Sequence, residues 1–150
     1  MQLDKDFKEF VSLLNAHKVQ YLIVGGYAVA AHGLPRYTGD FDTWVWLSQQ
    51  NAQKVVDVLE AFGFGGLGLS VEDFSREDSV VQLGYPPHRI DLLTTLTGLT
   101  FEDAWSHRLE VDIDGEIVGF IGREDLISNK RAVGRPQDLA DVSRLIGESE

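Results

Sequence analysis

The chain has 150 residues, of which 43% are hydrophobic and 25% are charged, as in an ordinary globular protein with one core. Its formal net charge of −11 repels polyanions and disfavours binding to bulk nucleic acid. The lack of cysteine excludes disulfides and thiolate metal sites. No apolar run reaches the roughly 20 residues of a membrane span, and the N-terminus is charged, so we expect a soluble cytoplasmic protein.

The residue pattern predicts alternating helices and strands along the chain. Apolar residues at helical spacing indicate helices, and β-branched or aromatic runs indicate strands. In the first half, the expected elements are a helix at 3–14, a strand at 19–24, a short helix at 26–33, a strand at 41–47 and a helix at 52–62. The glycine-rich stretch 63–68 that follows predicts a mobile connection.

The second half predicts hairpins and terminal helices. Asp114-Gly115 favours the positive φ angles of a tight turn, and Pro136 suits the first position of a helix. The expected elements are strands at 79–84 and 89–94, a helix at 101–107, a hairpin of 108–112 and 116–121, and helices at 124–132 and 136–146. This order predicts an α+β fold in a single domain over 1–150, with helices packed on a mixed, mostly antiparallel sheet.

Two acidic residues in one strand suggest a functional site. Asp40 and Asp42 are two positions apart, so their side chains project from the same face of the strand. Neighbouring carboxylates repel each other and usually hold a cation or share a proton. Because Asp40 follows Thr38-Gly39, the alternative is that it is simply an acid of a turn.

Asp91 is the candidate for a third ligand. It lies among apolar residues in a predicted strand, where a carboxylate is costly to bury without a partner. If this strand neighbours the strand of Asp40 and Asp42, three carboxylates converge, as two-metal phosphoryl or nucleotidyl transfer requires. The alternative is a buried salt bridge of Asp91 with Arg36 or Arg89.

Residues near the acids suit a phosphate group. Gly25-Gly26 ends an apolar strand, where backbone N–H groups that point outward can bind phosphate oxygens. Arg36 has two interpretations, as a contact of the triphosphate or as a salt-bridge partner that orients Asp40. We leave both open at this point.

Lys130 and Arg135 are further candidates for phosphate contacts. The aliphatic stem of Lys130 can lie on the packed face of its predicted helix while the ammonium group reaches a cleft. The alternative is a solvated charged surface, with a local pair between Arg135 and Asp138 that contributes little stability.

Aromatic and histidine residues near the acids receive simpler interpretations. Trp44 and Trp46 lie on the strand face of the acids, and we interpret them as core packing rather than as surfaces on which a base stacks. His32 and His88 could approach the site, but they lack the spaced partners of a zinc site.

The pattern Gly-Gly, then Arg-x-Thr-x-Asp-x-Asp, then a later isolated Asp in a strand resembles the DNA polymerase β-like nucleotidyltransferase superfamily. The segments RYTGDFDTWV, VQLGYPPHRIDLL and NKRAVGRPQDLADV are similar to those of small bacterial single-domain members related to the AbiEii-type toxin and minimal nucleotidyltransferase groups. The resemblance covers nearly the whole chain. It implies a mixed sheet with packed helices, nucleoside triphosphate donors and dependence on Mg²⁺, with Mn²⁺ as an alternative ion.

The resemblance also implies roles for individual residues. In the family pattern the paired acids bind both metal ions and the third acid helps to activate the acceptor, and these roles fall on Asp40, Asp42 and Asp91. Many members have Gly-Ser where this chain has two glycines, so a hydroxyl that often holds phosphate is missing at Gly26. Thr38 could supply it.

We therefore expect a metal-dependent nucleotidyltransferase that moves a nucleoside monophosphate group to an unknown hydroxyl acceptor and releases pyrophosphate. The alternative is a non-catalytic, antitoxin-like or protein-binding module that keeps the fold, and a metal-dependent phosphohydrolase is a third hypothesis. The acidic charge favours a small molecule or a protein over RNA as acceptor. We expect no membrane contact, and the acceptor would meet the loop 63–70, the turn 85–88 or a second protein.

Overall fold

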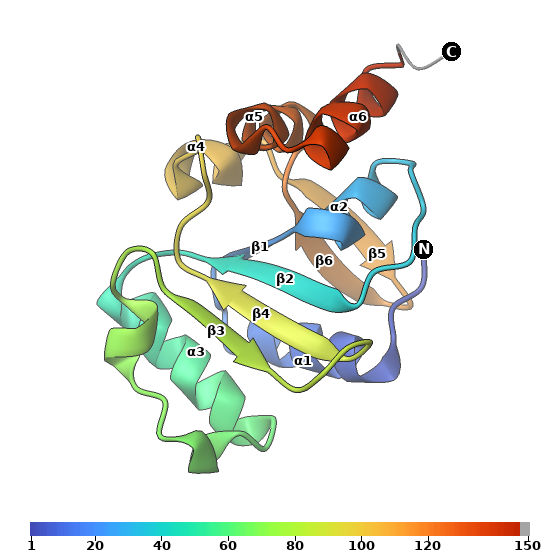
Figure 1. Ribbon diagram of the computed structural model, residues 1–150. Helices are drawn as coiled ribbons and strands as arrows, with labels where there is room; N and C mark the ends of the chain where they lie inside the picture. Colours follow the sequence, from blue (N-terminus) through green and yellow to red (C-terminus); the bar gives the residue numbers. More distant parts are fainter. Residues whose placement is uncertain (148–150) are drawn as a thin grey trace.

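A six-stranded sheet with helices on both faces forms the protein (Figure 1). The computed structural model describes residues 1–147, so the last three residues of the predicted domain lie outside the described part. Within residues 1–147, no helix is long and apolar enough to span a bilayer. The elements are α1 (Lys5–Ala16), β1 (Tyr21–Val24), α2 (Gly25–Ala31), β2 (Asp40–Val45), α3 (Gln49–Ala61), η1 (Gly65–Leu67), η2 (Val71–Phe74), β3 (Val80–Leu83), β4 (Arg89–Leu93), α4 (Phe101–Ser106), β5 (Leu109–Ile113), β6 (Glu116–Phe120), α5 (Arg123–Val133) and α6 (Pro136–Leu145).

The sheet is mixed, with the strand order β3-β4-β2-β1-β6-β5. The pairs β1–β6 and β2–β4 are parallel, whereas β1–β2, β3–β4 and β5–β6 are antiparallel. The predicted α+β fold with a mixed, mostly antiparallel sheet is therefore confirmed. Because β2 and β4 are parallel neighbours, both begin at the same end of the sheet (Figure 1).

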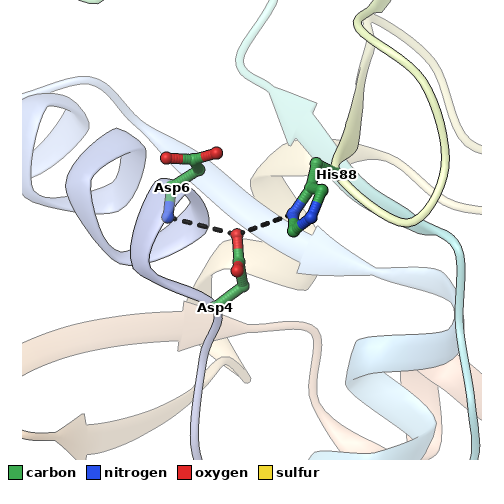
Figure 2. A group of neighbouring side chains, drawn as sticks. All are labelled: Asp4, Asp6 and His88. Carbon is green, nitrogen blue, oxygen red and sulfur yellow. Dashed lines mark hydrogen bonds and ion pairs between the residues drawn. The ribbon is translucent and has the colours of Figure 1, made fainter.

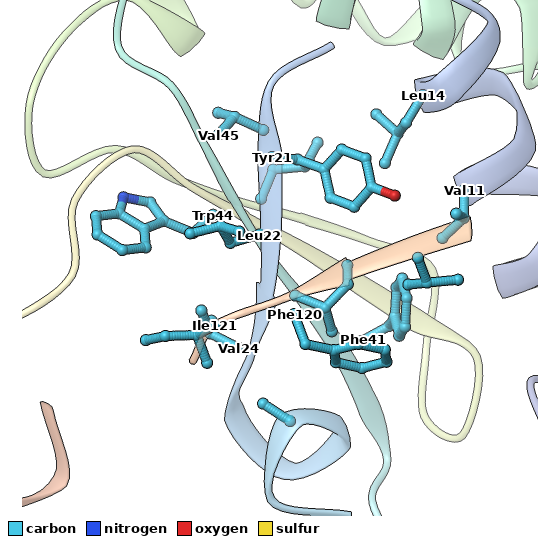
Figure 3. Packing of buried hydrophobic residues seen from close by; sticks show 14 of the residues in the cluster. Val11, Leu14, Tyr21, Leu22, Val24, Phe41, Trp44, Val45, Phe120 and Ile121 are labelled. Carbon is cyan, nitrogen blue, oxygen red and sulfur yellow. The ribbon is translucent and has the colours of Figure 1, made fainter. Parts of the chain in front are cut away.

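Apolar side chains on the two faces of the sheet form the core. Helices α1 and α3 cover one face, and α2, α4, α5 and α6 lie on the other side (Figure 1). On the first face, Phe7 of α1 stacks on Phe41 with ring centroids 4.7 Å apart. On the other face, Trp44 packs edge-on against Phe101 of α4 at 5.1 Å. Phe41 and Trp44 extend to different sides of β2 (Figure 3), so the acids share the face of Trp44.

The first strand is shorter than predicted because the backbone amides of its first two predicted residues donate to residues of helices. The amide of Val19 donates to the carbonyl of Leu14 at the end of α1, at 2.9 Å. The amide of Gln20 donates to Oδ1 of Asn51 in α3, at 2.8 Å. With these amides engaged by helices, β1 begins at Tyr21 rather than at position 19.

The glycine-rich stretch 63–68, predicted as a loop, contains a short helical turn. It contains the 3₁₀ turn η1 and leads into η2, and both contact α3. Phe74 of η2 is fully buried in the core. Burial of one phenylalanine side chain contributes about 2 kcal/mol, so this segment is anchored on the α3 side of the sheet.

Candidate active site

The neighbouring strands β2 and β4 bring three carboxylates together. In the parallel register, Asp42 lies opposite Asp91 and Asp40 lies opposite Arg89. Oxygen atoms of Asp40, Asp42 and Asp91 lie within 4.8 Å of one another. Asp91 is buried, and the other two acids are half-buried. The structure thus shows the convergence that a neighbouring pair of strands would produce, whereas metal binding by these acids stays a prediction.

Gly25 allows the backbone to pass close to Asp42. It follows Val24, the β1 residue that pairs with Asp42, and it has a φ angle of +68°. Glycine adopts this left-handed conformation readily because it has no Cβ. A Cβ at this position would also overlap Oδ2 of Asp42. The left-handed backbone conformation and the lack of room for a Cβ atom therefore both require glycine at position 25.

Arg89 is the cation that binds this cluster, and the sequence reasoning did not assign it to the site. Its Nε donates to Oδ1 of Asp91 at 2.8 Å, and its Nη2 donates to Oδ2 of Asp91 and to Oδ2 of Asp40, each at 3.1 Å. Of the two salt-bridge partners considered for Asp91, Arg89 forms the bridge. The available signal was its position two residues before Asp91, on the same face of β4.

Asp42 is the acid in this cluster whose ionisation is opposed most clearly. Burial of its carboxyl group, followed by the negative charges of Asp40 and Asp91, raises the pKa of Asp42 from 3.8 to about 8. The guanidinium of Arg89 bonds to the other two acids. At neutral pH, Asp42 therefore holds a proton beside its neighbours, and a cation placed between the acids would favour its release.

Thr38 places a hydroxyl beside Asp40 and Gly26. Its Oγ1 donates to the backbone oxygen of Asp40 at 3.2 Å and to Oδ1 of Asp40 at 3.3 Å. A Cβ on Gly26 would lie 2.8 Å from the same Oγ1. The Thr38 hydroxyl thus fills the space that a side chain at position 26 would occupy, although its contact with phosphate stays a prediction.

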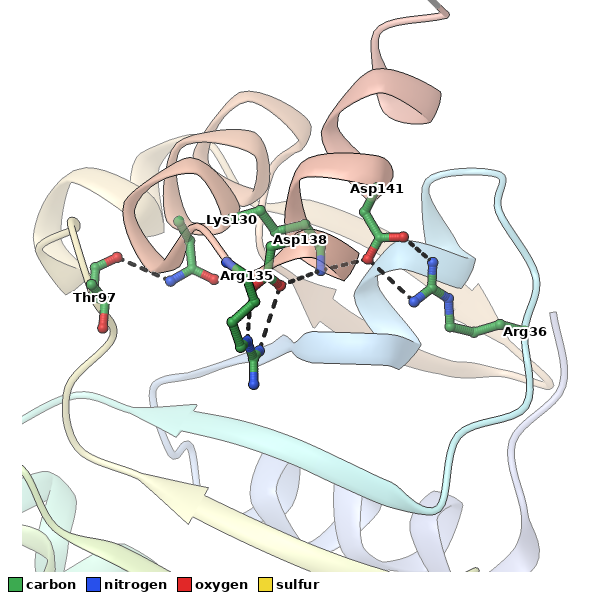
Figure 4. A network of polar contacts seen from close by, with 7 residues as sticks. Arg36, Thr97, Lys130, Arg135, Asp138 and Asp141 are labelled. Atoms are coloured by element: carbon green, nitrogen blue, oxygen red, sulfur yellow. Dashed lines mark hydrogen bonds and ion pairs between the residues drawn. The ribbon is translucent and has the colours of Figure 1, made fainter. Parts of the chain in front are cut away.

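A network of ion pairs joins the loop before β2 to α5 and α6 (Figure 4). Arg36 binds Asp141 with both terminal guanidinium nitrogens. Nζ of Lys130 lies 2.9 Å from Oδ2 of Asp141 and 3.5 Å from Oδ1 of Asp138, and Asp138 is bound by Arg135 at 2.8 Å. The predicted local pair of Arg135 and Asp138 is confirmed. Three cations and two anions give the network one net positive charge.

The pKa values of both aspartates reflect these contacts. Burial opposes the ionisation of Asp141, but hydrogen bonds from Arg36 and Lys130 outweigh it and lower the pKa of that carboxyl. The hydrogen bond from Arg135 is the main cause that lowers the pKa of Asp138. Both acids are therefore ionised at neutral pH, and Lys130 is held between them.

One cavity is lined both by residues of the network and by Asp42, one of the three acids. This cavity has a volume of about 290 Å³ and is lined by Gly25 and Asp42 on the sheet side and by Lys130, Arg135 and Asp138 on the helix side. Lys130 is buried, whereas the Arg135 side chain is 74% exposed. The structure thus brings two of the predicted phosphate-binding cations next to one of the predicted metal ligands.

Arg36 belongs to the network but does not line this cavity. The salt bridge considered between Arg36 and Asp40 is wrong, because Asp141 binds the guanidinium of Arg36 and Arg89 binds Asp40. Arg36 instead lines a different cavity, of about 590 Å³, together with Thr38. A direct contact of Arg36 with phosphate stays a prediction.

A second group of ionisable residues, Asp4, Asp6 and His88, has a structural explanation (Figure 2). Oδ2 of Asp4 accepts a hydrogen bond from the amide of Asp6 at 3.1 Å and thereby caps α1. The same oxygen lies 3.1 Å from Nδ1 of His88. His32 bonds to the carbonyl oxygen of Ile121 at 2.8 Å. Neither histidine belongs to the group formed by the three acids of β2 and β4.

Comparisons with known proteins place this arrangement in a family and a fold. Residues 1–147 match a family described as "Nucleotidyltransferase of unknown function" (DUF6036). None of the curated proteins matches the chain in sequence.

Solved structures with a similar fold are nucleotidyltransferases. The lincosamide antibiotic adenylyltransferase LnuA, with lincomycin bound, has a TM-score of 0.58 and 16% identity over 99% of each chain. A putative nucleotidyltransferase from Thermotoga maritima has a TM-score of 0.61 and 12% identity over 95% of this chain and 91% of its own. ANT(2")-Ia in complex with adenylyl-2"-tobramycin has a TM-score of 0.56 and 13% identity over 93% and 84%. At these identities, the likeness shows a shared fold.

The family match includes every strand and helix described above, the three converging acids and the network on α5 and α6. It therefore covers both sides of the cavity that holds Asp42 and Lys130. The chain belongs to this family of nucleotidyltransferases of unknown function.

Proposed function

We propose that this protein transfers a nucleoside monophosphate group from a nucleoside triphosphate to a hydroxyl of a small molecule and releases pyrophosphate. The observation that carries the proposal is the convergence of Asp40, Asp42 and Asp91 beside a cavity that also holds Lys130 and Arg135. Nucleotidyl transfer needs acids that bind metal ions and cations that bind phosphate. The Arg-x-Thr-x-Asp-x-Asp motif supports a finer placement in the DNA polymerase β-like superfamily, near its AbiEii-type members.

Mg²⁺, or Mn²⁺ in its place, fits the three acids. Both ions prefer oxygen ligands, and the group formed by Asp40, Asp42 and Asp91 supplies carboxylate oxygens at close spacing. Arg89 pairs with Asp40 and Asp91, whereas burial and the charges of these two acids raise the pKa of Asp42. When bound, such ions would neutralise charge on the triphosphate and lower the pKa of the attacking hydroxyl.

In this proposal Asp91 receives the proton of the acceptor hydroxyl. The acceptor oxygen forms a bond to the α-phosphorus while the bond from that phosphorus to the oxygen bridging the β-phosphate breaks. Pyrophosphate leaves with the electron pair of the broken bond. Two hydrogen bonds from Arg89 fix the direction of the Asp91 carboxylate, which suits a group that must meet an incoming hydroxyl.

The phosphates would lie between α2 and the α5–α6 pair. Lys130 and Arg135 face this cavity from one side, and the backbone of Gly25 faces it from the other. Gly26 and the Thr38 hydroxyl lie next to that backbone. The exposed Arg135 side chain can turn toward a phosphate at little desolvation cost.

Arg36 has an indirect role in this arrangement. It binds Asp141, which in turn lies 2.9 Å from the ammonium group of Lys130. A buried ammonium group needs such a partner to remain charged. We therefore propose that Arg36 helps to hold Lys130 in place rather than binding the nucleotide by itself.

A small-molecule acceptor is favoured by three observations. Two proteins that share the fold bind small molecules: the lincosamide antibiotic adenylyltransferase binds lincomycin, and ANT(2")-Ia binds adenylyl-2"-tobramycin. The net charge of −11 disfavours an RNA end. The cavity of about 590 Å³ at Tyr27, Thr38 and His88 is of the size of small-ligand pockets, and its Thr38 donates to Asp40.

The proposal is tested by following the α-phosphorus. The purified protein is incubated with α-labelled triphosphates, Mg²⁺ and a small-molecule extract of cells, and the products are separated. We expect a labelled small molecule and pyrophosphate from the wild type. We expect neither from the Asp42→Asn and Asp91→Asn variants, whose similar shape preserves the fold while removing a negative charge.

Other outcomes would identify the other hypotheses. Release of inorganic phosphate or free nucleotide without a labelled product would indicate a phosphohydrolase. If no triphosphate binds with or without Mg²⁺, the protein is a non-catalytic module. The missing hydroxyl at Gly26 favoured that module, but the hydroxyl of Thr38 lies in the corresponding space.

A further inference from the structure

Two tryptophans follow the acids along the same side of the sheet. Residues 40, 42 and 44 alternate along β2, so Trp44 projects from the face that carries Asp42. Trp46 follows just after the strand. At a rise of about 3.3 Å per residue, Trp44 lies about 7 Å along the strand from Asp42. A ribose spans a distance of this order.

The tryptophans line a cavity of about 280 Å³ with Phe101 of α4. The Phe101 ring lies 5.1 Å from Trp44, nearly perpendicular to it, and 5.5 Å from Trp46 at an angle of 37°. Trp44 is buried, as the sequence interpretation of core packing requires, but Trp46 is half-buried and keeps part of its ring accessible. An aromatic wall of this kind suits a planar group.

This aromatic cavity adjoins the cavity of the acids. Thr95 lines both of them, Thr94 before it lines the aromatic cavity, and Leu96 after it lines the cavity with Asp42. A ligand with phosphates at Lys130 can therefore extend past Thr95 without leaving the protein surface.

The charges of the two cavities differ. Glu77 and Glu102 line the aromatic cavity, and none of its lining residues in the described part of the chain is basic. These carboxylates repel phosphate, so the aromatic cavity suits an uncharged group whose amino substituents can donate hydrogen bonds. Lys130 and Arg135 lie in the other cavity, where phosphate is favoured.

We propose that the cavity of Trp44, Trp46 and Phe101 binds the nucleobase of the triphosphate, while Lys130 and Arg135 bind its phosphates. This inference rests on the proposed function, because it takes the ligand to be a nucleotide. It assigns affinity for the base to Trp46, which is the least buried of the three aromatic residues that line the cavity.

The test compares a nucleotide with a ligand that has phosphates but no base. Binding of ATP, GTP, CTP, UTP and tripolyphosphate is measured by isothermal titration in Mg²⁺, for the wild type and for Trp46→Leu. Loss of one stacked aromatic weakens base binding by about tenfold. We expect this loss for the best-bound nucleotide and no change for tripolyphosphate. Trp46→Phe should recover part of the affinity, because a smaller aromatic ring still stacks.

Trp105 provides a matched control. It stacks on Phe101 at 5.7 Å and so belongs to the same aromatic cluster, but it does not line the cavity. Trp105→Leu should leave both affinities unchanged.

Three results would overturn the inference or its basis. Unchanged nucleotide binding by Trp46→Leu would overturn the base site while leaving the proposed function intact. An equal loss for tripolyphosphate would also overturn it, since Trp46 would then act through the fold. If the wild type binds neither kind of ligand, the proposed function itself fails.

Discussion

Arg89 binds both carboxylate oxygens of Asp91, its neighbour two residues along β4, and also reaches Asp40 across the strand pair. One guanidinium group thus joins two of the three acids that converge on the candidate metal site. It supplies positive charge at the place where divalent ions would supply more.

Replacement of Arg89 by methionine should therefore have two opposite effects. The protein in EDTA should melt at a lower Tm, because the carboxylates of Asp40 and Asp91 then lose their shared counter-ion. The Kd for Mn²⁺ should fall several-fold, because a competing positive charge has been removed. Differential scanning calorimetry and titration with Mn²⁺ measure the two effects.

Arg89→Lys serves as the control for charge. It keeps the positive charge but loses the forked hydrogen bonds, so it should lie between the wild type and Arg89→Met in both measurements. Weaker Mn²⁺ binding by Arg89→Met would contradict the prediction and mean that Arg89 supports the metal ligands.

The raised pKa of Asp42 predicts that metal affinity depends on pH. With a pKa of about 8, Asp42 must release a proton before it can bind an ion. The affinity for Mn²⁺ should rise by up to about tenfold per pH unit from about pH 6 to about pH 8 and then level off. A flat profile over this range would show that Asp42 is already ionised.

The same pKa predicts a pH effect on stability without metal. The folded state holds the Asp42 proton more tightly than the unfolded state, so the free energy of unfolding should fall as pH rises from about 4 to about 8. In urea titrations with EDTA, Asp42→Asn should remove much of this loss and be more stable than the wild type at pH values above about 8. Equal pH profiles for both proteins would contradict the assignment to Asp42.

Gly26→Ser should destabilise the protein through Thr38. A Cβ at position 26 would lie 2.8 Å from Oγ1 and 3.0 Å from Cβ of Thr38, closer than packed atoms approach. Overpacking of this kind costs about 1–3 kcal/mol in the free energy of unfolding. The double variant Gly26→Ser, Thr38→Ala should recover part of the loss, because it removes Oγ1, the nearest atom, but keeps the Cβ of residue 38 at 3.0 Å. Chemical denaturation of the four proteins measures the coupling, and additive losses would exclude the contact.

Lys130→Met should destabilise the α5–α6 region. The ammonium group lies between Asp138 and Asp141, which are both buried, and its removal leaves these acids with less compensation. Because Arg135 and Arg36 still bind them, we expect a loss of about 2 kcal/mol, less than for a fully orphaned buried pair. Lys130→Arg keeps the positive charge, so its free energy of unfolding should fall by less than that of Lys130→Met. A Lys130→Met protein as stable as the wild type would mean that the two arginines suffice.

Local patterns predicted the common strand face of Asp40 and Asp42, which the structure confirms, but not their distance from Asp91. The two-residue spacing of Asp40 and Asp42 fixes their common face wherever the strand lies. Their distance from Asp91 depends on the parallel pairing of β2 with β4, which joins segments about 50 residues apart and has no local signature. The family resemblance supplied that link for the sequence analysis.

The contact partners of the arginines were harder to predict than the strand positions of the aspartates. Arg36 has a long flexible side chain and was equally compatible with Asp40 and with phosphate, but its partner Asp141 lies 105 positions later in α6. Arg89 was considered only as a partner of Asp91, since its additional contact with Asp40 requires the register of two strands. The cavity at Trp46 likewise needs α4, which contributes Phe101 from far along the chain.

The contact between Arg36 and Asp141 has a consequence for synthesis of the protein. The acids come from strands that leave the ribosome early, whereas the cations of the cavity come from the last two helices. A nascent chain that ends before α6 lacks the aspartates that hold Lys130 and Arg36. The three acids are thus synthesised before the aspartates that position Lys130 and Arg36, so under the proposed function we expect nucleotide binding to require the docking of α6.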